Sequence, residues 1–293
     1  MKKLSDSPHL FAFITVLCWA PSYVFNRTLA PFLSPESLGF LRFGIAAVIL
    51  SAILIRKKLP SPEPRDLPRF AAAALCGFSL YMIIFNKGTG MLTAATSSVI
   101  IAISPVLTTV LASVIFHERL KPVLWLFIGL EFAGIVILTD VRQGFSVNQG
   151  ILWMLLCVLM FSCFNLFQRK LTEKYTPLQT SGICIIFGAL ELIWAAPTAI
   201  REFTALPVLL KSYVLFLGLF SSALAYITWA KAFAKAKKTS DVVNYMFLTP
   251  FLAALLDFIL NREVPKPTVI IGGLMILAGA ILFNISRSRD AQK

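Results

Sequence analysis

Residues 104–122 read SPVLTTVLASVIFHERLKP, and residues 249–267 read TPFLAALLDFILNREVPKP. A shift of 145 positions superposes the two stretches without a gap, and the register continues into the neighbouring apolar runs. The identities that it aligns are Tyr81 with Tyr226, Pro105 with Pro250, Glu118 with Glu263, Lys121 with Lys266, and Gly134 with Gly279. A shift of 142 aligns Phe25, Arg27 and Pro35 with Phe167, Arg169 and Pro177. This register predicts two copies of one structural unit.

Apolar runs fill most of the chain, which is 58% hydrophobic and only 14% charged. A helix needs about 20 apolar residues to cross the hydrocarbon of a bilayer, where unpaired backbone groups are costly. Ten such runs are present, over residues 10–30, 36–55, 69–87, 93–116, 123–139, 149–169, 179–199, 211–234, 239–260 and 267–285. The sequence therefore predicts an all-α polytopic membrane protein with ten transmembrane helices.

Five helices per copy is an odd number, so the second copy must enter the membrane from the opposite side. We therefore expect two inverted repeats, residues 1–140 and 141–293. Of the 27 Lys and Arg residues, 19 lie in or beside gaps on the side of the N-terminus and 7 on the other side. The positive-inside rule then places both termini in the cytoplasm, and the expected location is a bacterial inner (plasma) membrane.

The net charge of +13 does not indicate a nucleic-acid partner, because the basic residues fall in short gaps between apolar runs. The five cysteines lie inside apolar runs with no close C-x-x-C pair, so neither a disulfide framework nor a metal site is expected. The only histidines, His9 and His117, lie outside the apolar cores, and no H-E-x-x-H or G-x-S-x-G motif occurs. We expect no cofactor and no enzymatic activity.

The sequence resembles the drug/metabolite transporter superfamily, in particular its ten-span EamA-type branch. The residues that carry the resemblance are Leu41-Arg42-Phe43, then Pro105, Glu118 and Gly134, and again Pro250, Glu263 and Gly279. The resemblance implies a secondary transporter, commonly an exporter of amino acids or other small metabolites. It also implies a central cavity lined by spans one, three, four, six, eight and nine. Trp19-Ala20 departs from a Trp-Gly step often seen in span one of such proteins.

Two helix faces predict a substrate-binding site. Trp19, Tyr23 and Asn26 share one face at i, i+4, i+7 spacing, and Phe161, Asn165 and Gln168 occupy the same relative positions in span six. Aromatic surface beside an amide suits a cavity for an amphipathic solute. The alternative is an aromatic helix contact with an amide near the interface.

A second pair of faces repeats the pattern. Tyr81 and Asn86 in span three align with Tyr226 and Lys231 in span eight, and Trp229 adds aromatic surface beside them. We place all five in the expected site. The alternatives are interfacial belt residues for the rings and a snorkelling side chain for Lys231.

Charged groups inside apolar runs are candidates for function by default. Arg42 lies deep in span two, as a structural clamp or as the attraction for an anionic solute group. Glu191 and Asp257 can relay protons if they are isolated, whereas Glu131 lies in a peripheral span and suits packing or a dimer contact. A monomer and a homodimer both remain open.

Pro105 follows Ser104 and Pro250 follows Thr249 near the centres of spans four and nine. A proline frees a backbone carbonyl and permits a bend, so both positions are hinge candidates, with static kinks as the alternative. The sequence predicts a secondary active transporter, an exporter of small amphipathic metabolites by alternating access. A passive channel or a structural membrane protein is the competing interpretation.

Overall fold

The computed structural model describes residues 7–115, 121–138, 148–235, 242 and 244–290. Every regular element in these ranges is helical, and none of them is a strand. The predicted all-α class is therefore confirmed for the described part of the chain. Glu118, one of the residues of the repeat, lies outside it.

The helices of the first half begin with α1. Their bounds are α1 Pro8–Leu29, α2 Pro35–Arg56, η2 Pro64–Asp66, α3 Leu67–Ala74, η3 Leu75–Ser79, α4 Leu80–Met91, α5 Ala94–Ile101, α6 Ser104–Ile115 and α7 Pro122–Leu138. Four of them start at a proline, whose missing N–H has no helical partner at that position in any case and whose φ suits the first turn. The proline positions therefore place the boundaries that the apolar runs only approximate.

The second half continues in the same manner. Its elements are α8 Gln149–Leu171, α9 Pro177–Glu191, η5 Ile193–Ala195, α10 Ala196–Ala205, α11 Val208–Phe216, η6 Leu217–Leu224, α12 Ala225–Lys235, η7 Asn244–Leu248, α14 Thr249–Asn261 and α15 Pro267–Asp290. The start of α9 carries a capping box, in which Thr176 accepts from the backbone N–H of Gln179 and the Gln179 side chain accepts from the N–H of Thr176.

The described residues hold seven helical stretches long and apolar enough to cross a membrane. An eighth is reached if Pro177–Glu191 and Ile193–Ala205, which meet at a bend of 47°, count as one span. Two further apolar helices, Pro122–Leu138 and Tyr245–Asn261, are shorter. In the part of the chain that the structure describes, each of the ten predicted runs is helical, but two fall short of a full span and the run 179–199 is bent.

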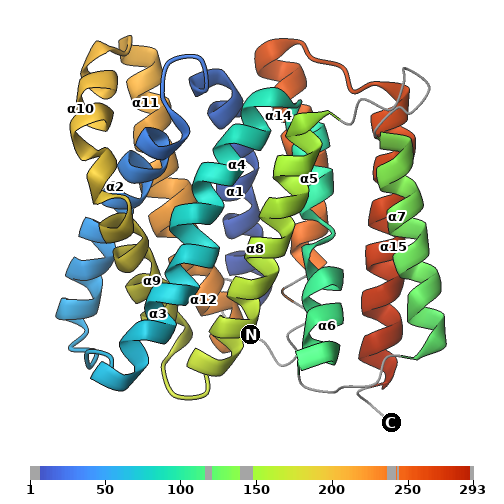
Figure 1. Ribbon diagram of the computed structural model, residues 1–293, viewed down its shortest axis with the longest axis horizontal. Coiled ribbons are helices and arrows are strands. Elements are labelled where there is room, and N and C mark those ends of the chain that lie inside the picture. The colour runs from blue at the N-terminus through green and yellow to red at the C-terminus, as the bar shows by residue number, and fades with distance from the viewer. Residues whose placement is uncertain (1–6, 116–120, 139–147, 236–241, 243, 291–293) are drawn as a thin grey trace.

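The helices assemble with the two halves in contact along several pairs, including α1 with α12 and α14, α2 with α9, and α4 with α8. The α7 and α15 helices pack on each other beside this body, at one edge of the molecule (Figure 1). Large apolar side chains on the outer faces are exposed, as in Ile55 at 76% and Leu126 at 71%. Such surface suits lipid rather than water.

Two helices contain a π-helical segment at corresponding positions. The η3 segment, Leu75–Ser79, precedes α4, and the η6 segment, Leu217–Leu224, precedes α12. The shift of 145 residues aligns the end of one with the end of the other. Single π-turns inside α-helices occur frequently at functional sites.

Candidate functional site

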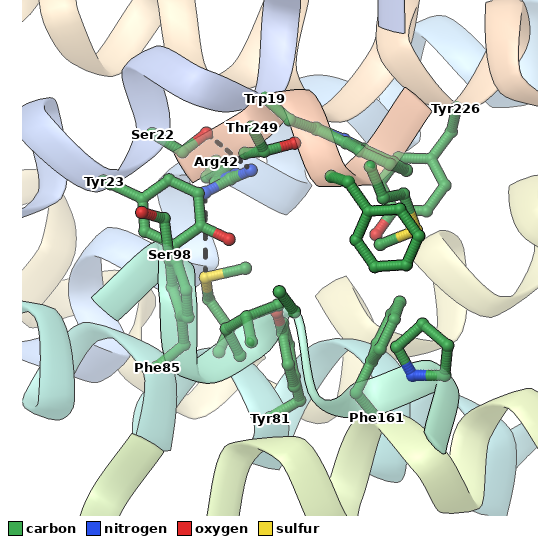
Figure 2. A pocket seen from close by; sticks show the side chains of 16 residues that line it. Trp19, Ser22, Tyr23, Arg42, Tyr81, Phe85, Ser98, Phe161, Tyr226 and Thr249 are labelled. Carbon is green, nitrogen blue, oxygen red and sulfur yellow. Dashed lines mark hydrogen bonds between the residues drawn. The ribbon is translucent and has the colours of Figure 1, made fainter. Parts of the chain in front are cut away.

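A central cavity of about 70 Å³ lies between the two halves. Its walls come from α1, α2, α4, α5 and α6 of the first half and from α8, α12, η7 and α14 of the second. The lining residues are Trp19, Ser22, Tyr23, Arg42, Tyr81, Met82, Phe85, Ser98, Ile101, Ala102, Pro105, Phe161, Tyr226, Met246, Phe247 and Thr249 (Figure 2). A volume of this size holds several water molecules.

Aromatic rings from both halves form most of the wall. The Trp19 ring meets Tyr226 edge-on at 5.6 Å between centroids, and Tyr81 lies 5.5 Å from Phe161. Tyr23 contacts Phe85 at 5.4 Å. Tilted and edge-on contacts of this kind stabilise ring pairs beyond simple burial. Six aromatic residues were predicted for the site, and all of them except Trp229 line this one cavity.

The two tyrosines of the repeat owe their placement to the π-helical segments. Tyr81 comes two residues after η3, and Tyr226 comes two residues after η6. An extra residue in a helical turn rotates every side chain that follows it. The sequence showed the tyrosines in register but gave no sign of the π-turns that precede them.

Arg42 is buried, 4% exposed, and reaches the cavity from α2. Its Nε donates to the Ser222 hydroxyl at 2.6 Å, and Nη2 donates to the Ser22 hydroxyl at 3.3 Å. Nη1 lies 3.9 Å from the Met82 sulfur. These contacts tie α2 to α1, α4 and η6, but through hydroxyls and a thioether rather than through the ion pair or the carbonyls expected of a structural clamp. They do not exclude the other expected role, because the guanidinium also lines the cavity.

The predicted amides do not line the cavity. Asn26 and Asn86 are both buried and hold each other, with Asn26 Nδ2 donating to Asn86 Oδ1 at 3.0 Å. Asn86 Nδ2 in turn donates to the Pro35 carbonyl at 2.8 Å. Asn26 shares the face of Trp19, but seven residues along a helix displace it by about 10 Å. These amides join α1 and α4 to the start of α2.

The amides of span six lie beyond the cavity for the same reason. Asn165 Nδ2 donates to the Thr108 hydroxyl at 3.1 Å, and Gln168 Nε2 donates to the Ser181 hydroxyl at 3.4 Å. Each bond joins α8 to a neighbouring helix, α6 in the first case and α9 in the second. The i, i+4, i+7 spacing showed which residues share a helix face, but not which of them lie at the level of the cavity.

Trp229 and Lys231 also lie outside the lining. The Trp229 ring packs on Trp19 at 5.1 Å, one layer away from the cavity. Lys231 is exposed, and its Nζ lies 5.5 Å from the centre of the Phe11 ring. The expected alternative for Lys231, an interfacial side chain, matches this position.

The predicted coupling carboxylates have protein partners. Asp257 is buried and accepts from the backbone N–H of Ala94 at 3.1 Å, from Asn261 Nδ2 at 2.7 Å and from Arg27 Nη1 at 3.4 Å. Asp257 thus caps the N-terminus of α5 from another helix. Glu191 accepts a short hydrogen bond from Ser79, at the end of η3. Neither carboxylate lines the cavity.

Glu131 is buried between α7 and α15, where its Cγ lies 2.7 Å from the position that a Cβ on Gly279 would take. Its Oε1 has no hydrogen-bond partner among the described residues. The packing role expected for Glu131 agrees with this place in a helix interface.

The two prolines stand at helix starts rather than at kinks inside a continuous helix. Pro105 is the second residue of α6, after a break from α5, and Pro250 is the second residue of α14, after η7. The carbonyl of Ile101, which Pro105 cannot pair, accepts from the Ser104 hydroxyl at 2.6 Å. Both positions are therefore discontinuities of the backbone beside the cavity, at places related by the repeat.

Several lining residues have no counterpart among the predicted candidates. They are Ser22, Met82, Phe85, Ser98, Ile101, Ala102, Met246, Phe247 and Thr249. Ser22 lies three residues after Trp19, so the helical face that identified Trp19 also carried it. Met246 and Phe247 lie in η7, where no regular periodicity was available.

An apolar helical body with seven or eight stretches able to cross a membrane indicates, in the described residues, a multi-pass membrane protein. Residues 7–140 and residues 148–285 each match the model of the EamA-like transporter family. The two matches cover most of the chain, so this protein belongs to the EamA-like transporter family, within the drug/metabolite transporter superfamily. The resemblance seen in the sequence is confirmed.

Two relatives match this protein in sequence over nearly the full length of both chains. A "Probable terminal-alkyne amino-acid exporter" of Streptantibioticus cattleyicolor is 27% identical over 285 residues, which cover 95% of this chain and 94% of the relative. An "Uncharacterized transporter" of Archaeoglobus fulgidus is 25% identical over 276 residues, covering 94% and 97%. One solved structure, titled only as the crystal structure of a protein, has a TM-score of 0.64 over 96% of this chain and 98% of its own, at 20% identity. That likeness shows a shared fold.

Proposed function

We propose that this protein is a secondary active transporter that exports small amphipathic metabolites, such as amino acids or related solutes, by alternating access. The observation that carries the proposal is the central cavity, whose wall is divided between the two halves. A site at the junction of two repeats can open to either side when one half moves against the other. Trp19, Tyr23, Tyr81, Phe161 and Tyr226 are the proposed contacts of the solute.

The proposal includes ten spans in two inverted repeats, residues 1–140 and 141–293. Contacts between α7 and α15 support it. A Cβ on Gly134 would meet the Gly272 carbonyl at 2.7 Å, and a Cβ on Gly279 would meet the Phe127 carbonyl at 2.9 Å. The shift of 145 residues turns the first of these pairs into the second. These contacts run antiparallel between α7 and α15, as two inverted repeats would require of this pair of corresponding spans.

Two further correspondences support the repeat. The π-helical segments η3 and η6 precede the paired residues Tyr81 and Tyr226. The break between α5 and α6 corresponds to η7 ahead of α14, and a proline follows each of them. Matches of one family model to both halves point the same way.

The proposed location is a bacterial inner membrane with both termini in the cytoplasm, supported by the excess of Lys and Arg in alternate loops. The relative from Streptantibioticus cattleyicolor is named as an amino-acid exporter, which supports export of that class of solute here. Asn26, Asn86, Asn165, Gln168, Trp229 and Lys231 remain predictions as solute contacts, as do Glu191 and Asp257 for proton coupling.

Counterflow in proteoliposomes tests the proposal. Vesicles loaded with unlabelled solute, drawn from a panel of amino acids and related metabolites, are diluted into trace labelled solute. A carrier accumulates labelled solute inside the vesicles transiently above its equilibrium level. The unlabelled solute inside the vesicles speeds the return of the carrier's binding site to the outer side, where the label is. Label that only equilibrates would assign a channel instead, and no uptake across the panel would remove the transport proposal for these solutes. Repeating the assay with an imposed pH gradient tests proton coupling.

A further inference from the structure

The positive charge of Arg42 has no acidic partner among the described residues. A guanidinium carries five N–H groups. Its partners in the structure are the hydroxyls of Ser22 and Ser222 and the sulfur of Met82, so two N–H groups remain without an acceptor. No Asp or Glu of the described ranges lies within ion-pair distance of it.

The cavity contains no compensating negative charge either. The described side chains that line it include one cation, Arg42, and no carboxylate. Its other polar groups are neutral, the hydroxyls of Ser22, Ser98, Thr249 and the three tyrosines and the indole N–H of Trp19. The lining therefore has a net charge of +1, carried by a buried side chain, and a buried charge is costly unless it is paired.

The rest of the lining suits an apolar body. Figure 2 shows Arg42 and Ser22 on one side of the cavity and Phe161 across from them. Rings of Trp19, Tyr81 and Phe161 line the space together with Arg42. A guanidinium pairs with a carboxylate through two parallel charge-assisted hydrogen bonds, and two free N–H groups are what such a pair needs.

We infer that the cavity selects organic anions, in which a carboxylate pairs with Arg42 and an apolar body packs on the aromatic wall. The inference rests on the proposed function and narrows its class of solute. A primary ammonium group finds no carboxylate in the lining and meets a like charge at Arg42. The site therefore prefers an anion to the isosteric neutral amide, and excludes the corresponding amine.

The test uses three probes with one phenyl body, 3-phenylpropionate, 3-phenylpropionamide and 2-phenylethylamine. Their binding to the purified full-length chain in lipid nanodiscs is measured by titration calorimetry at neutral pH. We expect the anion to bind about tenfold or more tightly than the amide, as a hydrogen bond to a charged group contributes, and the amine to bind more weakly than both. Equal affinities for anion and amide, tighter binding of the amine, or no binding of the anion overturns the inference.

Variants then assign the preference to Arg42. Arg42→Gln should bring the anion to the affinity of the amide, whereas Arg42→Lys should keep part of the preference. Arg65→Gln is the control, because the Arg65 side chain is 76% exposed and outside the cavity. A preference that survives Arg42→Gln overturns the assignment. If Arg42→Gln does not insert, because the clamp to Ser22 and Ser222 is lost, the ranking of the probes by the natural chain still decides.

Failure of this inference and failure of the proposed function give different results. Counterflow of a zwitterion or a cation with no preference for the anion leaves the transporter in place and removes the anion site. Binding of 3-phenylpropionate that depends on Arg42, with no counterflow of any probe, leaves the anion site in place and removes the transport proposal for these solutes.

Discussion

Replacing Asp257 by alanine tests the junction of α14 with α5 and α1. The carboxylate is buried and accepts three hydrogen bonds, from the Ala94 N–H, from Asn261 and from Arg27. Its removal leaves the buried Ala94 N–H in the first turn of α5 without its acceptor, although Thr93 still caps the N–H of Thr96. Loss of a cap costs about 1 kcal/mol, and a buried donor left unsatisfied costs about 1 to 3 kcal/mol.

The ion pair contributes less. The Arg27 side chain is 31% exposed and keeps a second acidic partner, Glu263, at 3.6 Å. Loss of the ion pair between Arg27 and Asp257 therefore costs under about 1 kcal/mol, because solvent screens it. We expect Asp257→Ala to lower the free energy of unfolding by about 2 to 3 kcal/mol. Asp257→Asn should cost about 1 kcal/mol, since its amide oxygen can still accept from Ala94.

The assay is equilibrium unfolding in mixed micelles of increasing SDS content, with Glu263→Gln as the control for the exposed side of the network. An Asp257→Ala variant within about 0.5 kcal/mol of the natural chain would refute the reasoning. The same variants separate stability from coupling. An Asp257→Asn protein that is fully stable but transports without regard to a pH gradient would assign Asp257 to proton coupling instead.

Three further predictions concern other contacts. Gly272→Val should push α7 and α15 apart, because a Cβ there would lie 2.6 Å from a backbone carbonyl. It should lower the free energy of unfolding by about 1 to 3 kcal/mol in the same assay. Gly129→Val is the neutral control, because a Cβ at Gly129 would meet open space. Asn86→Leu should destabilise the fold by about 1 to 3 kcal/mol through the lost bonds to α1 and α2, measured beside solute flux in vesicles; an unchanged fold with lost flux would return Asn86 to the solute site. The hydrogen bond from Lys174 lowers the pKa of Glu63, and bonds to acidic partners raise the pKa of Lys174. Their contribution to stability is therefore complete at neutral pH, falls as Glu63 is protonated in acid, and falls again as Lys174 is deprotonated in strong alkali. Lys174→Met should reduce the loss of stability in acid when unfolding is measured against pH, and an unchanged loss would contradict this.

The sequence carried most of the fold because lipid imposes strong rules. Apolar runs of sufficient length must be helical in a bilayer, and all ten are helical in the described residues. The bend after Glu191 was not foreseen, although Glu191 and Pro197 both interrupt the apolar run 179–199 and Pro197 lies in the first turn of α10. Sharp helix bends commonly lie at a proline, so the sequence did hold a signal for this one.

The site could be predicted in part. Rings at helical spacing, such as Trp19 and Tyr23, reach the cavity because the face that they share points inward. Asn26 has the same angular position but lies two turns further along, and only the relative depth of the helices decides which residues meet. The role of Arg42 stayed open in the sequence because its partners, Ser22 and Ser222, are neutral and far apart in the chain.

Opposed orientation of the two halves is the central claim, and impermeant thiol labelling tests it most directly. Single cysteines replace Ser61 and Thr204 in a cysteine-free chain, at exposed positions in the α2–α3 connection and near the end of α10. These regions correspond in the repeat and lie at opposite ends of the molecule (Figure 1). We expect a membrane-impermeant maleimide added to intact cells to label position 204 and to spare position 61 until the membrane is opened. Labelling of both positions from one side would contradict the inverted repeat.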